Sequence, residues 1–170
     1  MMATNNHRGF SIIETVFYVA VIGVVIVAAV AMAFGAIQSF NRLKATANLA
    51  RAGEGALTRL EYEIRRAESL NLSGSVLNNH PGVLALNTKL ADGSPATVSF
   101  FIQNDTLMIT DTNGASYALL PLYASTTEFI TRQITASSSN GAAIILKLHD
   151  LRQPELVADF MVSAVMRGSY

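Results

Sequence analysis

The chain has 170 residues and a mass of 18.2 kDa, which corresponds to about one domain with a short extension. Hydrophobic residues make up 51% of it and charged residues 14%, a composition that excludes an intrinsically disordered chain. The formal net charge is zero, so we do not expect a globally basic nucleic-acid-binding protein. Cysteine is absent, which excludes disulfide scaffolds, thiol catalysis and metal sites built from cysteine.

The hydrophobic residues are concentrated near the N-terminus. The segment 10–40 contains one charged residue, Glu14, and within it 16–37 has no ionisable group except the phenol of Tyr18. Because a membrane-spanning helix needs about 20 apolar residues, this segment is long enough to cross a bilayer. It is longer than the apolar part of a cleavable secretory signal, and no Ala-x-Ala site follows it before the polar residues begin. We therefore predict a transmembrane or assembly helix over 10–37.

Glu14 is the most informative residue of this segment. A carboxylate in a membrane-spanning helix costs about 2.5–3.5 kcal/mol near the bilayer centre, and such groups usually have a partner. One interpretation is that Glu14 lies one turn inside the helix and extends its carboxylate to the lipid headgroups. The alternative interpretation is that it meets a charged partner.

Residues 8–15, Arg-Gly-Phe-Ser-Ile-Ile-Glu-Thr, resemble the class III signal of type IV prepilins and of the pseudopilins of type II secretion. That signal is a short polar leader ending in a basic residue and glycine. Phenylalanine, three mostly apolar or small residues and a glutamate at the fifth mature position follow. The match stands directly before the apolar run, which is the context that the signal requires.

The resemblance implies that 1–9 is a leader and that prepilin peptidase cuts the chain after Gly9. The new amine of Phe10 would then be N-methylated. During assembly the carboxylate of Glu14 would pair with the Phe10 amine of a neighbouring subunit. Such a pair offsets much of the desolvation that each charge suffers alone in a medium of low dielectric constant.

The segment 38–72 is predicted to continue the helix as an amphipathic stretch, and 71–74 is predicted to end it. Glu61 precedes Arg65 by four residues, the favourable order for an ion pair. Most charges of this segment are interpreted as solvated surface, and a local bend is expected at Gly53 and Gly55. The predicted apolar stripe consists of Phe40, Leu43, Ala47, Ala50, Leu57, Leu60, Ile64 and Ala67.

Beyond Gly74 the hydrophobic pattern alternates, which predicts a β-sheet domain over 73–170. Asn104 and Asp105 suit a hairpin turn between 97–103 and 106–110, with Val98, Phe100 and Ile102 facing Leu107 and Ile109. We assign no structure to 124–133 and predict that the serine-rich segment 136–141 is a loop. Further strands are predicted at 82–87, 116–120, 142–148 and 156–167, the last with Leu156, Ala158, Phe160, Val162, Ala164 and Met166 on one side.

These elements predict an α+β fold in which a long N-terminal helix packs on a mostly antiparallel sheet. This order of elements is also that of pilins and pseudopilins. Within that family, 60–67 is similar to the end of the helix in the J-type pseudopilin and its pilus-side relatives. Positions 119–121, Phe129 and 144–148 are similar as well. The absence of cysteine departs from the disulfide-closed loop of many major pilins and favours a minor pilin or pseudopilin.

Few residues suggest catalysis or metal binding. No spacing brings two of the histidines, His7, His80 and His149, onto one helical turn. The segment 111–114 resembles the start of a calcium loop but lacks the ligands that should follow, so a plain β-turn is preferred. No phosphate-binding loop, nucleophile elbow or zinc-protease motif occurs. We therefore expect neither an enzyme nor a metal or cofactor site.

The resemblance implies a structural subunit of a type IV pilus or a type II secretion pseudopilus. Its expected partners are other pilin or pseudopilin subunits, prepilin peptidase, the inner-membrane assembly platform and membrane lipid, but not nucleic acid. Its expected location is a bacterial inner membrane, as a single-pass protein with the distal domain outside the cytoplasm, and afterwards the fibre. The alternative is a signal-anchored membrane protein whose distal domain binds an envelope partner without entering a fibre.

Overall fold

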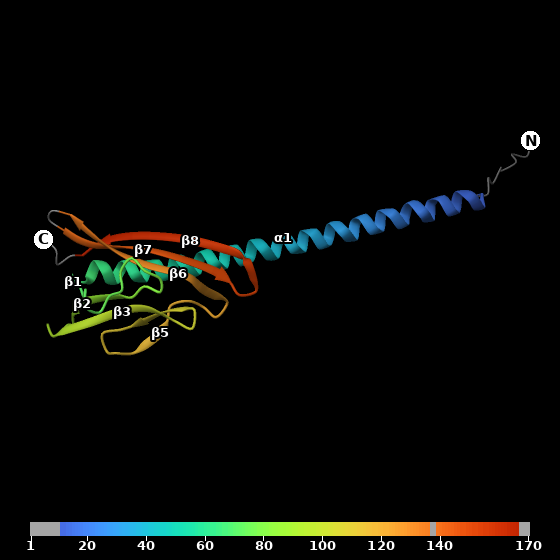
Figure 1. The fold of residues 1–170 in the computed structure, drawn as a ribbon. Coiled ribbons are helices and arrows are strands. Elements are labelled where there is room, and N and C mark those ends of the chain that lie inside the picture. Colours follow the sequence, from blue (N-terminus) through green and yellow to red (C-terminus); the bar gives the residue numbers. More distant parts are fainter. Residues whose placement is uncertain (1–10, 137–138, 167–170) are drawn as a thin grey trace, which may run out of the picture. The chain divides into compact units, whose positions relative to one another are not determined.

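The structure, a computed structural model, describes residues 11–136 and 139–166. It has the predicted α+β class, with one long N-terminal helix packed against antiparallel sheets (Figure 1). Helix α1 (Ile12–Arg66) is uninterrupted, and the glycines at 53 and 55 lie within it. The chain divides into two compact units, Met1–Leu43 and Lys44–Tyr170, and the boundary between them falls inside α1.

One face of α1 is buried in the Lys44–Tyr170 unit. The buried helix residues lie three or four apart, except for the last two, which are adjacent; they are Leu49, Gly53, Ala56, Leu60, Glu63 and Ile64. The predicted stripe is confirmed at Leu60 and Ile64, and at Ala67, which follows the helix. It is wrong at Phe40, Leu43 and Ala47, which are exposed. The reason is that burial of the helix begins at Leu49, beyond these three residues. The buried face also includes a glycine and a glutamate, which a search for apolar residues leaves out.

Helix α1 ends at Arg66, earlier than predicted, because the next residues pair with a strand. The backbone N–H of Glu68 donates to the Asn87 carbonyl at 2.9 Å. The following two residues form β1 (Ser69–Leu70), which lies antiparallel to β2 (Leu84–Lys89). A strand of two residues has no hydrophobic period of its own, so the local sequence cannot reveal it.

A five-stranded antiparallel sheet has the order β1-β2-β3-β4-β5. Its further strands are β3 (Pro95–Gln103), β4 (Thr106–Thr110) and β5 (Ser116–Ala118). The predicted hairpin is confirmed, since Phe100 pairs with Ile109 and Ile102 pairs with Leu107. Asn104 and Asp105 have φ angles of 49° and 55°, which are the left-handed values of a two-residue type I′ turn.

A three-stranded antiparallel sheet consists of β6 (Ala124–Ala136), β7 (Ser139–Asp150) and β8 (Gln153–Val165), in that order. Strand β6 covers the segment left without a prediction. A bulge between Thr126 and Glu128 interrupts its alternation, which hides the strand from a search for period two. The predicted alternation in β8 is confirmed, with its half-buried side chains turned to the core.

The predicted loop over 136–141 is wrong where the structure describes it. Asn140 and Gly141 belong to β7 and pair with Thr135 and Ile134. A Cβ on Gly141 would lie 2.4 Å from the carbonyl oxygen of Ala164, so glycine allows the close approach of β8. Backbone pairing therefore extends beyond the apolar residues from which the strand was predicted, and residues 137 and 138 lie outside the described part.

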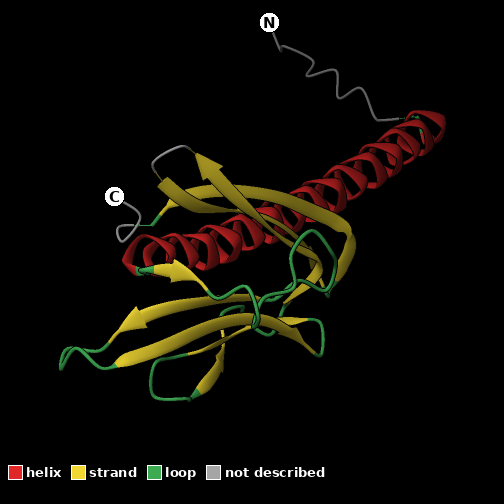
Figure 2. Ribbon diagram, turned by 60° about the vertical axis from the view of Figure 1, so that its left-hand side comes forward, coloured by secondary structure: helices red, strands yellow, loops and turns green. Residues whose placement is uncertain are grey.

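The core lies where α1 meets both sheets, and Figure 2 shows the strands beside the C-terminal part of the helix. Its largest fully buried side chains include Leu60 and Ile64 of α1, Phe100 of β3 and Phe129 of β6. The ring of Phe160 from β8 covers the helix backbone at Gly53, where a Cβ would come within 2.2 Å of its Cζ atom. Gly53 thus provides the space for this ring.

Two glycines of the same helix offer a matched test of that packing. Nothing lies within 4 Å of a Cβ at Gly55, so Gly55→Ala should raise the free energy of unfolding by up to about 1 kcal/mol through helix propensity. Gly53→Ala must displace the Phe160 ring, and overpacking of this kind costs about 1–3 kcal/mol. We expect Gly53→Ala to be less stable than Gly55→Ala by about that amount in denaturant unfolding of the full chain in detergent.

A second substitution serves as a control. Phe160→Leu shortens the side chain above Gly53, so it should reduce the cost of Gly53→Ala in the double variant. Equal stability of the two alanine variants would contradict the packing assigned to Phe160.

Candidate functional site on the N-terminal helix

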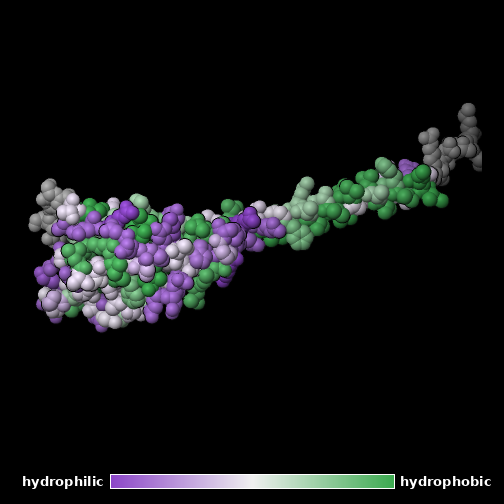
Figure 3. Space-filling view, viewed as in Figure 1, coloured by the Kyte–Doolittle hydropathy of each residue, from purple (hydrophilic) through white to green (hydrophobic). Residues whose placement is uncertain are grey.

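In its described part, the Met1–Leu43 unit is a helix whose apolar side chains are exposed on every side. Figure 3 shows this part of α1 as an almost continuous run of hydrophobic residues. From residue 16 to residue 37 it measures about 33 Å at about 1.5 Å per residue, close to the hydrocarbon thickness of about 30 Å. The helix is therefore long and apolar enough to cross a membrane. Its exposed large side chains include Ile12, Ile13, Val16, Phe17, Val19, Val24, Val25, Val27, Met32, Phe34, Ile37 and Phe40.

Glu14 lies in the first turn of this helix. The backbone N–H groups of Glu14 and Thr15 both donate to the carbonyl oxygen of Ser11, at 3.0 and 3.1 Å. The Glu14 side chain is exposed and forms no hydrogen bond or ion pair with any other described residue. This part of the chain thus presents one carboxylate at the end of an apolar surface.

The predicted processing site lies outside the described residues. The predicted leader 1–9, which ends at Gly9, and Phe10 after it are not among the residues that the structure describes. Cleavage after Gly9 and methylation of Phe10 therefore stay predictions from the sequence. Of the predicted site residues, the structure places Glu14.

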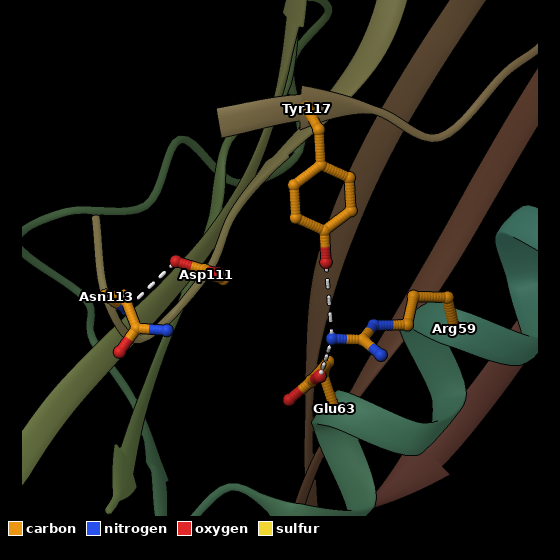
Figure 4. Close-up of polar contacts among 5 residues, drawn as sticks. All are labelled: Arg59, Glu63, Asp111, Asn113 and Tyr117. Atoms are coloured by element: carbon orange, nitrogen blue, oxygen red, sulfur yellow. Dashed lines mark hydrogen bonds and ion pairs between the residues drawn. The ribbon is translucent and has the colours of Figure 1, made fainter. Parts of the chain in front are cut away.

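A polar cluster inside the Lys44–Tyr170 unit connects α1 with the edge strand β5 (Figure 4). The side chain of Glu63 is only 4% exposed, and its Oε1 lies 2.6 Å from Nη2 of Arg59, one helical turn away. The same nitrogen donates to the hydroxyl of Tyr117 at 3.5 Å, and the Arg59 guanidinium lies 5.7 Å from the centre of the Tyr62 ring. The arginine thus neutralises a buried carboxylate and holds the helix near β5, which is a structural role.

Sequence reasoning missed Glu63, because charges at helical spacing are normally solvated. Two signals were present in the sequence. Glu63 stands three residues after Leu60 and follows Arg59 at the spacing of an ion pair. A charge on the apolar stripe with a partner one turn away indicates a buried pair.

The other candidates for chemistry lie apart from one another. Oδ1 of Asp111 accepts the backbone N–H groups of Asn113 and Ala115, both at 2.9 Å, so the preferred β-turn is confirmed (Figure 4). His80 accepts the backbone N–H of Phe129 at 3.1 Å, and Nδ1 of His149 lies 3.0 Å from the hydroxyl of Thr127. Within residues 11–136 and 139–166, no group of three or more histidines and acids is arranged to hold a metal ion.

Two surface groups have shifted pKa values with local causes. The pKa of Lys147 is raised because the Glu128 carboxylate, paired with it across β6 and β7, accepts its hydrogen bond at 2.6 Å. The pKa of Asp92 is lowered because the hydroxyl and the backbone N–H of Ser94 donate to its carboxylate at 2.6 and 2.9 Å. Both arrangements stabilise a hairpin and indicate no binding site.

Comparison of the chain with protein-family models, curated proteins and solved structures gives no significant match.

Two ion pairs within α1, Arg59 with Glu63 and Arg65 with Glu61, provide a matched test of the buried cluster. Arg59→Met keeps most of the aliphatic side chain but leaves the Glu63 carboxylate buried without its cation. We expect a loss of about 1–3 kcal/mol in the free energy of unfolding. Arg65→Met breaks the more exposed pair with Glu61 at the same spacing, and it should change this free energy by less than about 0.5 kcal/mol.

Denaturant unfolding in detergent measures both variants. The double variant Arg59→Met with Glu63→Met removes both charges, so it should recover most of the stability lost in Arg59→Met. Similar losses for Arg59→Met and Arg65→Met would contradict a structural role for the buried pair.

Proposed function

We propose that this chain is a structural subunit, a minor pilin or pseudopilin, which prepilin peptidase cleaves after Gly9 and methylates at Phe10. It then assembles through α1 into a type IV pilus or a type II secretion pseudopilus. The observation that carries the proposal is Glu14, an exposed carboxylate in the first turn of a helix whose first part is otherwise apolar on every side. The sequence 8–15 around it, with its resemblance to the prepilin signal, supports the same proposal.

A simple membrane anchor does not require this carboxylate. Lipid covers an apolar helix without any charge, and a carboxylate in the membrane raises the cost of insertion. A cation that meets Glu14 after insertion would offset this cost, and the amine of a processed neighbouring chain is such a cation. In this proposal, Glu14 therefore sets the position of one helix along the next.

The apolar surface would have two successive environments. Lipid covers it while the subunit waits in the inner membrane, and the helices of other subunits cover it in the fibre. The assembly platform would mediate the transfer between them. The Lys44–Tyr170 unit, which has its own core, would lie outside the cytoplasm and on the outside of the fibre.

The resemblance of 60–67 to J-type pseudopilins is the finer part of the proposal. In this segment Leu60, Glu63 and Ile64 are buried inside the chain's own domain. Their role in the proposal is to hold the sheets on the helix. Contacts with other subunits would use exposed residues.

The test combines processing with assembly in the native host. We expect the protein from membranes to begin at N-methylated Phe10, as shown by N-terminal sequencing and intact mass, and Gly9→Val to block this processing. Glu14→Gln keeps the size of the side chain and removes its charge, so it should insert normally but assemble poorly. Because an amine left without its counter-ion costs about 3 kcal/mol, the assembled fraction should fall about a hundredfold.

Thr15→Ala is the matched control, since it changes the neighbouring polar residue and leaves the charge in place. It should be processed and assembled like the unaltered chain. Normal assembly of Glu14→Gln would overturn the proposed role of the carboxylate. A chain that still begins at residue 1 or 2 would favour the signal-anchored alternative.

A further inference from the structure

We infer that the outer edge of β8 binds an extended segment of another protein, which adds a fourth strand to the sheet of β6, β7 and β8. The partner segment runs antiparallel to β8, carries apolar side chains at alternate positions and has a lysine or arginine opposite Asp159. This edge belongs to the Lys44–Tyr170 unit alone. The inference therefore goes beyond the proposed function and does not depend on it.

The outer side of β8 is uncovered within the described residues. Strand β8 is the last in the order β6-β7-β8, and Figure 1 shows it along the margin of its sheet. No described residue outside β7 forms a backbone hydrogen bond with residues 157–165. Strand β6, at the other margin, is covered by an earlier loop. The carbonyl oxygen of Thr131 accepts the backbone N–H of Asn78 at 2.8 Å, and the Phe129 carbonyl accepts that of Gly82 at 2.9 Å.

The register of the sheet shows which backbone groups of β8 are open. The N–H of Met166 donates to the carbonyl oxygen of Asn140 at 2.9 Å, next to the pair of Gly141 with Val165. In an antiparallel ladder, pairs that exchange hydrogen bonds alternate with pairs that do not. The N–H and C=O of Val165 therefore point away from β7. The same holds for every second residue before it, so the open groups belong to Val157, Asp159, Met161, Ser163 and Val165.

This edge lacks most of the features that protect open strands. Protected edges are commonly very short or carry prolines and charges. The edge strands of the other sheet, β1 and β5, have two and three residues. Strand β8 has 13 residues, with Pro154 and Glu155 at its beginning. Its outward side chains then include Val157, Met161 and Val165, which are 57%, 73% and 46% exposed. An open backbone beside exposed apolar side chains is typical of a surface that binds an added strand.

The charges on the neighbouring strands indicate the chemistry of the partner. Glu128, Lys147 and Asp159 lie side by side on β6, β7 and β8. Nζ of Lys147 lies 2.6 Å from Oε2 of Glu128, whereas Asp159 forms no ion pair with a described residue. Because the row alternates in sign and ends on an acid, a cation on a fourth strand would continue it. The adjacent row is apolar and consists of Ile130, Ile145 and Met161.

A second copy of the chain fits this edge less well. Strand β8 contains Glu155 and Asp159 but no lysine or arginine. If β8 pairs with β8 of a second copy, the added strand therefore offers no cation to Asp159. A register that places the two Asp159 residues opposite each other is repulsive. We therefore assign the edge to a different protein.

Two short peptides labelled with a fluorophore at the N-terminus test the inference on the full chain in detergent. The first is Val-Thr-Thr-Thr-Val-Thr-Lys-Thr-Val. In antiparallel pairing it places its lysine opposite Asp159 and its valines opposite Val157, Met161 and Val165. The second peptide has glutamate in place of lysine. In fluorescence anisotropy we expect saturable binding of the lysine peptide and about fivefold weaker binding of the glutamate peptide.

Two substitutions separate the charge from the backbone pairing. Asp159→Lys should reverse the preference, so that the glutamate peptide binds more tightly. Met161→Pro removes an N–H that points away from β7, which keeps the ladder of the sheet intact, and it should weaken binding of the lysine peptide about tenfold. Met161→Thr is the matched control, because it keeps this N–H, and it should weaken binding less than Met161→Pro. Circular dichroism shows that each variant is folded.

Methylated peptides test the same pairing on the unaltered chain. Methylation of the backbone nitrogen of the central valine removes the N–H that faces Met161, so it should weaken binding about tenfold. Methylation of the next threonine removes an N–H that points away from β8, so binding should change little.

The contrary results are distinct. If the lysine peptide shows no saturable binding to the folded chain, the inference is wrong. Equal binding of the two charged peptides, or equal effects of the two methylations, would contradict the pairing assigned to β8. A dimer of the chain in sedimentation that Met161→Pro dissociates would identify a second copy as the occupant and overturn the assigned partner. None of these results bears on processing after Gly9 or on Glu14, so the proposed function stands or fails separately.

Discussion

The structure depends on one helix whose two parts have different surroundings. The first part of α1 is apolar on every side, whereas from Leu49 onward only one face is buried. A helix of 55 residues cannot hide the first part within so small a protein, so another phase or another molecule must cover it. The sheets pack only against the second part of α1. The residues on its buried face determine how closely the sheets approach the helix.

Two residues that are uncommon on the buried face of a helix, Gly53 and Glu63, determine how the sheets pack on it. Gly53 gives up helix propensity and makes room for the ring of Phe160, which brings β8 close to the helix backbone. Glu63 places a carboxylate in the core, and the cost is offset by Arg59, whose side chain reaches the hydroxyl of Tyr117. The glycine and the ion pair thus position the two sheets on the same helix by different means, close packing on one side and charge on the other.

The sequence predicts the features that depend on neighbouring residues. The long helix, the α+β class and the hairpin around Asn104 and Asp105 follow from hydrophobic period, turn chemistry and length. The end of α1 does not, because strand β1 exists only through its pairing with β2 far along the chain. Strand β6 is not predicted because its bulge interrupts the alternating pattern. The burial of Glu63 is not predicted because it depends on sheets that lie far along the chain. At the candidate site the apolar helix and Glu14 are evident from the sequence, whereas the contact of Arg59 with Tyr117 needed the fold.

The apolar surface of α1 determines how the concentration of the protein is expressed. In the proposed function α1 is inserted in a membrane, so the copies of the chain are confined to a plane and are counted per area of membrane instead of per volume of cell. Confinement removes one direction of diffusion and aligns the copies, which lowers the entropic cost of their association. The threshold for association is then a surface density, which rises with synthesis and falls as the membrane grows. A cell could therefore change such a protein from separate to associated copies by changing its surface density, with no change in the residues that form the contacts.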